Sequence, residues 1–324
     1  MIAISTAVPG KAELVTPFEP REIRYAFHDI DGTHSLIRDW VPAMALTLGW
    51  VLEHGLPPDD PDAALRLMLA EVGRPFEEAH RFSIESAGLS ALTQMEWAIR
   101  GALQNGMIRD VPFDRRINAG VIRRIWDGEE LFDDCQEGAS VKSLIREHSA
   151  ALFRIYERIL LAMSRDRNLE SARKDPRPWR VPGSMEFLRY LRDCGVRNFF
   201  VTGAVVECDA LGRPHGTMCE EVSALGYEIG PGRLLEGLEG SSWHEKQPKS
   251  QIMRNLCRRL GVPPEQILVV GDGRSEIGAG VAMGAVTLSR LPRSAVRARQ
   301  IHAALHTNFI MDEYQMDAIR TILR

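Results

Sequence analysis

Short apolar runs alternate with helical patterns in the last part of the chain, and this alternation constrains the fold more than any other feature. The runs typical of strands are 23–28, 196–201, 267–270, 285–289 and 308–311. Segments with the apolar spacing of helices lie between or after them, at 184–193, 217–226, 249–260, 275–283, 293–304 and 313–323. Strands that alternate with helices are typical of βαβ units. We therefore predict an α/β fold with a parallel sheet.

Residues 37–178 have a different pattern. Apolar residues recur there at helical spacing in 38–54, 62–72, 88–104, 116–127 and 141–164, and strand signals are nearly absent. This predicts an all-helical insert within the α/β domain. The predicted organisation is an N-terminal arm or extra edge element at 1–22, a core made of 23–36 and 179–324, and a helical domain at 37–178.

Charge and cysteine content exclude several classes of partner. The 324 residues carry a formal net charge of −4, so no overall basic field favours nucleic acid or an acidic membrane. The five cysteines show no C-x-x-C spacing, which argues against a structural zinc site. No apolar run approaches the length of a membrane span, and the N-terminus does not resemble a signal peptide. We expect a cytoplasmic protein with no nucleic-acid or membrane partner.

Polar residues follow three of the predicted strands: Asp29 and Asp31, then Thr202, then Asp272. Because ligands bind at the carboxyl ends of parallel strands, we expect these groups to converge on one edge of the sheet. Close carboxylates repel, and a cation relieves that repulsion. Oxygen ligands alone select a hard cation, which predicts Mg²⁺. The alternative is that Asp-x-Asp is an acidic turn that caps the next helix.

The residues beside these carboxylates suit phosphate. Gly32 permits a tight turn, and Thr33 offers a hydroxyl and an N–H to a phosphate oxygen. Thr202 followed by Gly203 offers a similar combination. The run Gly-Asp-Gly at 271–273 could also suggest a dinucleotide site, but that fingerprint needs a third glycine where Glu276 stands.

Four segments in order resemble the motifs of the haloacid dehalogenase superfamily. Residues 27–33, Phe-His-Asp-Ile-Asp-Gly-Thr, resemble the first motif, and residues 199–203, Phe-Phe-Val-Thr-Gly, resemble the second. A lysine within 245–249, Glu-Lys-Gln-Pro-Lys, resembles the third, and residues 270–277 resemble the fourth. The resemblance implies a Rossmann-like core, with the helical insert as its cap domain.

The resemblance also implies a mechanism and a set of roles. Asp29 would attack phosphorus and form an aspartyl-phosphate, and Asp31 would act as general acid and then base. The metal ligands would be Asp29, Asp272 and the main-chain carbonyl of Asp31. Thr202, with Gly203, and a lysine would bind the phosphoryl oxygens. The presence of Asp31 favours a phosphatase or a phosphomutase, and our leading hypothesis is a phosphatase of a small phosphorylated metabolite. A sugar phosphomutase is the nearest alternative, and a non-catalytic binding or regulatory module is another.

The lysine and the fourth motif leave residue choices open. Lys249 and Lys246 both precede the helix that leads to Asp272, and we favour Lys249 on its spacing from Asp272. Glu276 stands where the family usually has a second aspartate, so its place among the metal ligands is open. Gly273 and Thr33 are further candidates for the site. The arginines at 38, 81, 116 and 124 are candidates for binding remote anionic groups of a substrate.

Overall fold

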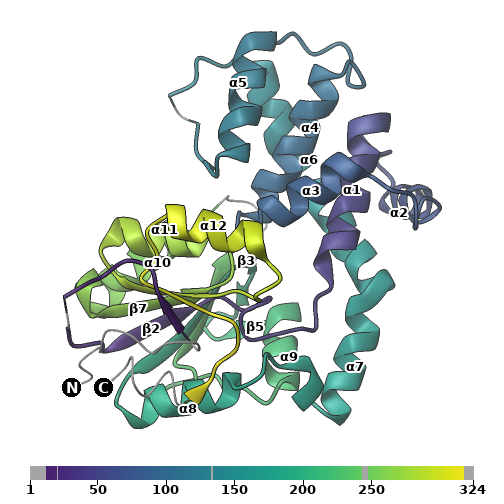
Figure 1. Ribbon diagram of the computed structural model, residues 1–324. Coiled ribbons are helices and arrows are strands. Elements are labelled where there is room, and N and C mark those ends of the chain that lie inside the picture. The colour runs from purple at the N-terminus through teal and green to yellow at the C-terminus, as the bar shows by residue number, and fades with distance from the viewer. Residues whose placement is uncertain (1–11, 20, 133, 243–246, 317–324) are drawn as a thin grey trace. The chain divides into compact units, whose positions relative to one another are not determined.

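The computed structural model describes residues 12–19, 21–132, 134–242 and 247–316 (Figure 1). The chain divides into two compact units. The first comprises 1–37 and 168–324, and the second comprises 38–167.

The first unit is built on a seven-stranded sheet of order β1-β9-β8-β7-β2-β3-β6. Every pairing is parallel except that of β1 with β9 at one edge. The strands are β1 (Ala12–Leu14), β2 (Tyr25–His28), β3 (Arg197–Val205), β6 (Gly237–Ser241), β7 (Ile267–Gly271), β8 (Val286–Arg290) and β9 (Phe309–Met311). The predicted α/β class with a Rossmann-like sheet is confirmed.

Helices cover both faces of this sheet. The helices of this unit include α8 (Ser184–Asp193), α9 (Thr217–Ala224), α10 (Lys249–Leu260), α11 (Arg274–Met283) and α12 (Val296–Ala304) (Figure 1). Successive strand residues point to opposite faces, so Ala26 packs in a cluster with Phe187 of α8. Its neighbour Phe27 packs in a separate cluster with Ile252 of α10. Strand β2 is thus central and apolar on both faces, as a buried parallel strand requires.

Two parts of this unit differ from the sequence prediction. Strand β6 was not predicted, because its sequence Gly-Leu-Glu-Gly-Ser has little intrinsic β preference. It forms by pairing with β3, and Leu238 is buried. Strand β3 also continues past the predicted end at 201, to Val205, with a register shift against β6. A short hairpin of β4 (Glu207–Cys208) and β5 (Pro214–His215) follows.

The predicted N-terminal arm and final helix lie partly outside the described residues. Within the arm, Ala12–Leu14 form the antiparallel edge strand β1. Residues 1–11 and 20 are not described, nor are residues 317–324 of the predicted helix 313–323.

In the second unit the described residues are helical, with no strand among them. The helices are α1 (Trp40–His54), α2 (Pro61–Leu69), α3 (Glu77–Glu85), α4 (Ala91–Gln104), α5 (Arg115–Trp126) and α6 (Ala139–Leu160), followed by the π-helical turn Leu161–Arg165. Helix α3 was not predicted, although Phe82 is buried and stacks on Trp97 with ring centroids 3.8 Å apart. The buried Arg100 pairs with Glu96 and Glu137.

This helical unit ends at Arg167, before the predicted boundary at 178. The reason lies in α7 (Asp166–Lys174), where Leu169 and Ala172 pack in a core cluster of the first unit with Leu188. The apolar residues of α7 therefore belong to the sheet unit's core. The assignment of 37–178 as a cap domain stays a prediction.

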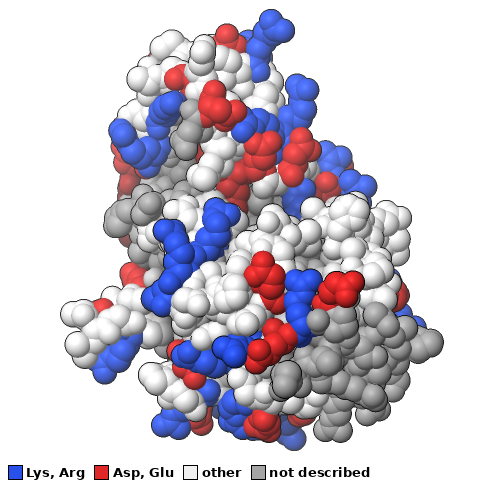
Figure 2. All heavy atoms as spheres, turned by 90° about the vertical axis from the view of Figure 1, so that its left-hand side faces the viewer, with Lys and Arg blue, Asp and Glu red and all other residues white. Residues whose placement is uncertain are grey.

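Charged side chains are mixed on the face of the molecule in Figure 2, where basic and acidic groups are interspersed. This agrees with the small net charge of −4. Among the described residues, no helix combines the length and the apolar character needed to cross a membrane.

Candidate active site

The turn after β2 carries Asp29 and is fixed by its own main chain. Asp29 N donates to Val270 O of β7 over 2.8 Å. The carbonyl of Ile30 accepts the N–H groups of Thr33 (3.2 Å) and His34 (2.8 Å), closing a tight turn. Gly32 lies in this turn at φ +76°, a left-handed conformation that favours glycine. The carboxylate of Asp29 is thereby held at the carboxyl end of a central strand.

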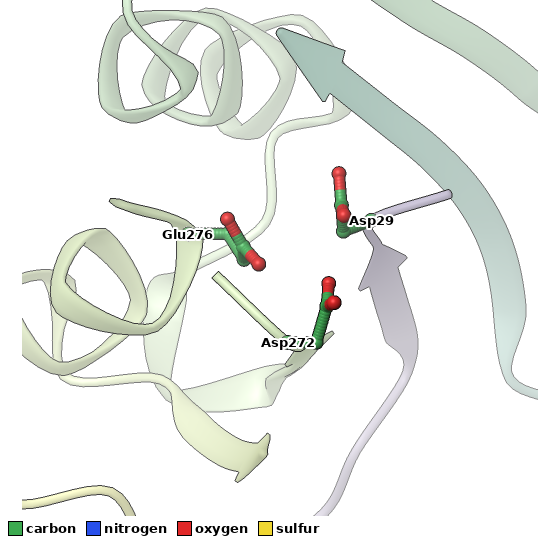
Figure 3. A group of neighbouring side chains, drawn as sticks. All are labelled: Asp29, Asp272 and Glu276. Atoms are coloured by element: carbon green, nitrogen blue, oxygen red, sulfur yellow. The ribbon is translucent and has the colours of Figure 1, made fainter. Parts of the chain in front are cut away.

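Three carboxylates meet at this point, those of Asp29, Asp272 and Glu276 (Figure 3). One oxygen from each lies within 4.8 Å of the others. Asp272 follows β7 directly and accepts a hydrogen bond from Thr33 Oγ1 over 3.0 Å. Glu276 lies in the first turn of α11 and accepts a hydrogen bond from Gly273 N over 2.5 Å. Residues far apart in the sequence thus form one acidic group.

Lys249 is the cation of this group. It is the first residue of α10, and its side chain is only 3% exposed. Its Nζ lies 2.5 Å from Asp29 Oδ1 and 2.9 Å from Glu276 Oε2. Burial of an unpaired ammonium is unfavourable, and the two adjacent carboxylates offset that cost. The other lysine candidate, Lys246, lies outside the described residues.

The burial of this group perturbs its proton affinities. Burial raises the pKa of Asp29 to about 6, against the opposing effect of the Lys249 ammonium. Burial also raises the pKa of Asp272 well above its usual range, and the carboxylates of Asp29 and Glu276 add to that rise. For Lys249, burial lowers the pKa, but the two adjacent carboxylates outweigh it and the net direction is upward. The site therefore has more negative charge than its single ammonium can neutralise.

The remaining predicted residues lie nearby in the fold. Asp31 is half-buried in the turn, and its main chain forms an isolated β-bridge with Ser35. Thr202 is buried on β3, the strand beside β2, and its hydroxyl accepts the N–H of Ala204 over 3.1 Å. Gly203 follows it within β3. Hydrogen bonds connect Lys249 with Asp29 and Glu276, and Glu276 with Gly273, while Asp272 bonds to Thr33 and lies within 4.8 Å of the other two carboxylates. Thr202 and Gly203 lie on the neighbouring strand β3.

Three residues beside the turn were missed by sequence reasoning. Arg290, the last residue of β8, donates from Nη1 to the carbonyl of Gly32 over 2.9 Å. Its place at a strand's carboxyl end is the signal that could have found it. His28 and His34 flank the turn and are fully buried. A histidine in an otherwise apolar strand is a signal that could have indicated His28.

Three of the four arginines considered for substrate binding contact another side chain within the helical unit, and Arg116 is exposed. Arg38 pairs with Glu157 over 3.1 Å, and Arg124 pairs with Asp134 over 3.0 Å. Arg81 lies over the ring of Trp126, with the guanidinium carbon 5.3 Å from the ring centroid.

The comparisons with known proteins bear on the sheet unit. Residues 180–284 match the model of the haloacid dehalogenase-like hydrolase family. This stretch contains Thr202, Lys249, Asp272 and Glu276. Within the sheet unit, this segment is similar to the haloacid dehalogenase-like hydrolases. The resemblance seen in the sequence is confirmed over this segment, and with it the expectation of a hydrolase.

Solved structures of this kind are similar over most of the chain, at low identity. A β-phosphoglucomutase from Clostridium difficile is 10% identical, with 92% of this chain and 96% of that chain covered, at a TM-score of 0.48. A predicted phosphoglycolate phosphatase from Haemophilus somnus is 17% identical, with 93% and 98% covered, at 0.44. A phosphonoacetaldehyde hydrolase-like protein from Oleispira antarctica is 12% identical, with 93% and 92% covered, at 0.48. At this level of likeness no activity is transferred from them.

Proposed function

We propose that this protein is a Mg²⁺-dependent phosphatase of a small phosphorylated metabolite that acts through an aspartyl-phosphate on Asp29. The observation that carries the proposal is the contact of the buried Asp29 carboxylate with the Lys249 ammonium, beside the carboxylates of Asp272 and Glu276. A nucleophile, a cation for phosphoryl oxygens and oxygen ligands for a hard metal ion are thus together. Few other functions need all three at one strand end.

The acidic group suits a divalent cation. Three carboxylates against one ammonium leave an excess of two negative charges, 3 − 1 = 2, when all are ionised. The donor atoms are all oxygens, which hard cations prefer. Asp29 and Asp272 would hold the ion, with the carbonyl of Asp31. Glu276 already accepts hydrogen bonds from Lys249 and Gly273, so we assign it to orienting the lysine. When bound, Mg²⁺ would supply positive charge to the phosphoryl oxygens.

The chain's own residues would carry the chemical steps. An Asp29 oxygen forms a bond to phosphorus as the bond to the leaving oxygen breaks, and Asp31 gives that oxygen its proton. Asp31 then takes a proton from a water whose oxygen attacks phosphorus, which releases phosphate and restores the Asp29 carboxylate. Lys249, with Thr202 and Gly203, would bind the phosphoryl oxygens through both steps.

The helical unit would act as a lid that sets specificity and excludes water. Its own buried core, with Phe82 stacked on Trp97, supports folding as a unit. Deletion of 38–167, the helical unit, should therefore change the substrate profile more than metal affinity.

The test is phosphate release from a panel of sugar phosphates, nucleotides, phospho-amino acids and phosphoglycolate, with Mg²⁺ and with EDTA. Asp29→Asn should be inactive, because an amide cannot form the acyl phosphate. Asp193→Asn, at an exposed carboxylate on α8, is the matched control and should keep full activity. Activity of Asp29→Asn close to that of wild type would contradict the covalent mechanism.

The same assay separates the alternatives. A phosphomutase would require a catalytic amount of a bisphosphate and would return the phosphoryl group to a product. A binding module would be inactive on the whole panel, which would refute the proposal.

A further inference from the structure

A chain of buried polar side chains connects both ends of the Asp29 turn to the rest of the sheet unit. It runs from Asn198 on β3 through the two histidines and Ser184 to Tyr227. Asn198 Oδ1 lies 3.1 Å from His28 Nε2, and His28 Nδ1 lies 3.1 Å from His34 Nε2. His34 Nδ1 lies 2.7 Å from Ser184 Oγ, which lies 2.5 Å from the hydroxyl of Tyr227. All five side chains are at most 2% exposed.

The proton positions in this chain are fixed from the Asn198 end. The Asn198 amide nitrogen donates to the carbonyls of Leu188 (3.0 Å) and Leu234 (3.2 Å), so its oxygen is the atom that faces His28. His28 Nε2 must then carry the hydrogen. A neutral imidazole has one donor and one acceptor, so His28 Nδ1 accepts from His34 Nε2.

The same reasoning continues past the histidines. His34 Nδ1 is left as an acceptor for the Ser184 hydroxyl. The Tyr227 hydroxyl then donates its one hydrogen, which is shared between Ser184 Oγ at 2.5 Å and the main-chain carbonyl of His34 at 3.2 Å. Each hydrogen bond therefore has one direction, and the polar ring atoms of both histidines are satisfied.

This chain holds the turn at two points. His28 immediately precedes Asp29, and His34 follows Thr33. The His34 ring is also parallel to two aromatic rings, at 10° and 5.2 Å from Tyr314 and at 8° and 6.5 Å from Phe187, and these two rings stack on each other with centroids 4.7 Å apart. Two apolar side chains could fill this volume without the desolvation that buried polar groups require. What an apolar pair could not supply is a single orientation, fixed by directional bonds.

We propose that His34 is a positioning residue for the nucleophile turn, and that it holds Asp29 and Asp31 in place through its bonds to His28 and Ser184. This inference rests on the proposed function, since the turn is catalytic only if Asp29 is the nucleophile. Substitution of His34 should therefore act on the chemical step more than on substrate binding.

The test compares steady-state hydrolysis of p-nitrophenyl phosphate, or of the best substrate of the panel, across matched variants. His34→Leu fills the volume and removes both ring nitrogens. We expect kcat to fall about 10- to 100-fold, as misplacement of reacting groups does, with KM within about two-fold. His34→Gln offers an amide donor and acceptor and should restore part of kcat. His302→Leu removes another buried histidine of the same unit, whose Nδ1 lies 2.8 Å from Ser289 Oγ, and should keep kcat within about two-fold of wild type.

The folded fraction of each variant, from circular dichroism, separates positioning from simple loss of structure. If His34→Leu does not fold, Ser184→Ala, which removes one hydroxyl, should show the same selective loss of kcat. Wild-type kcat in the folded His34→Leu, or a loss that only follows the unfolded fraction, would overturn the inference alone. A wild-type protein inactive on every phosphomonoester would instead refute the proposed function, and this inference with it.

Discussion

Gly32 gives the sharpest test of how the turn and the acidic group depend on each other. A Cβ added at Gly32 would lie 2.0 Å from Asp272 Oδ2 and 2.8 Å from Asp272 Cγ. Both distances are shorter than any real Cβ contact, so Gly32→Ala must displace either the turn or the Asp272 carboxylate. Displacement of that carboxylate also breaks its hydrogen bond from Thr33.

The expected cost has two parts. A left-handed non-glycine residue costs about 1–2 kcal/mol. Loss of a hydrogen bond to a charged group costs about 1.5–3 kcal/mol. We therefore expect Gly32→Ala to lower the free energy of unfolding by about 2.5–5 kcal/mol. Gly195→Ala is the matched control, because Gly195 has φ +85° and no neighbouring atom within 4 Å of the added Cβ. Gly195→Ala should lower the free energy of unfolding only by the cost of the left-handed conformation.

Urea unfolding followed by circular dichroism measures both free energies. Phosphate release should fall at least about 10²-fold in Gly32→Ala and stay near wild type in Gly195→Ala. Equal stability of the two variants, together with full activity of Gly32→Ala, would show that the added Cβ displaces neither the turn nor the Asp272 carboxylate. That result would contradict the expected loss of stability.

Three further predictions concern charge. Lys249→Ala should lower kcat by about 10²-fold or more, because it removes the ammonium that pairs with Asp29. Lys246→Ala should keep kcat within a few-fold of wild type. The reverse result would assign the binding of the phosphoryl oxygens to Lys246. EDTA should abolish turnover and Mg²⁺ should restore it, and full activity in metal-free buffer would contradict the metal assignment. Burial lowers the pKa of His302 from 6.5 to about 4, so below pH 6.5 the unfolded chain binds a proton that the folded protein does not. Stability should fall by about 3 kcal/mol between pH 6.5 and 4 from this group, and denaturant unfolding of His302→Leu should lack that part of the pH dependence; an unchanged slope would contradict it.

The sequence predicted those elements of the fold whose local residue pattern matches the way the element is buried. Strand β2 is a short apolar run that is buried on both faces, so its pattern was clear. Strand β6 was not predictable, because its two glycines give no local signal and its stability comes from pairing with β3. The predicted boundary at 178 lies beyond Arg167, where the second compact unit ends, because the spacing of apolar residues in α7 shows that one face is buried but not which core it joins.

The candidate site was predictable in its residue types and less so in its contacts. The rule that strand ends converge correctly brought Asp29 and Asp272 together. It gave no information on Glu276, whose role follows from the capping turn of α11 and from the reach of Lys249. The histidines were missed because each looks unremarkable alone, and only the packed structure shows His28 bonded to His34.

The central claim is that Asp29 becomes covalently phosphorylated. Acid quenching of the enzyme during turnover of a ³²P-labelled phosphomonoester from the panel, followed by peptide mapping, tests it. We expect a hydroxylamine-sensitive label on the peptide that contains Asp29, and no label in Asp29→Asn. Rapid phosphate release by an enzyme that never carries this label, or the same label in Asp29→Asn, would contradict the claim.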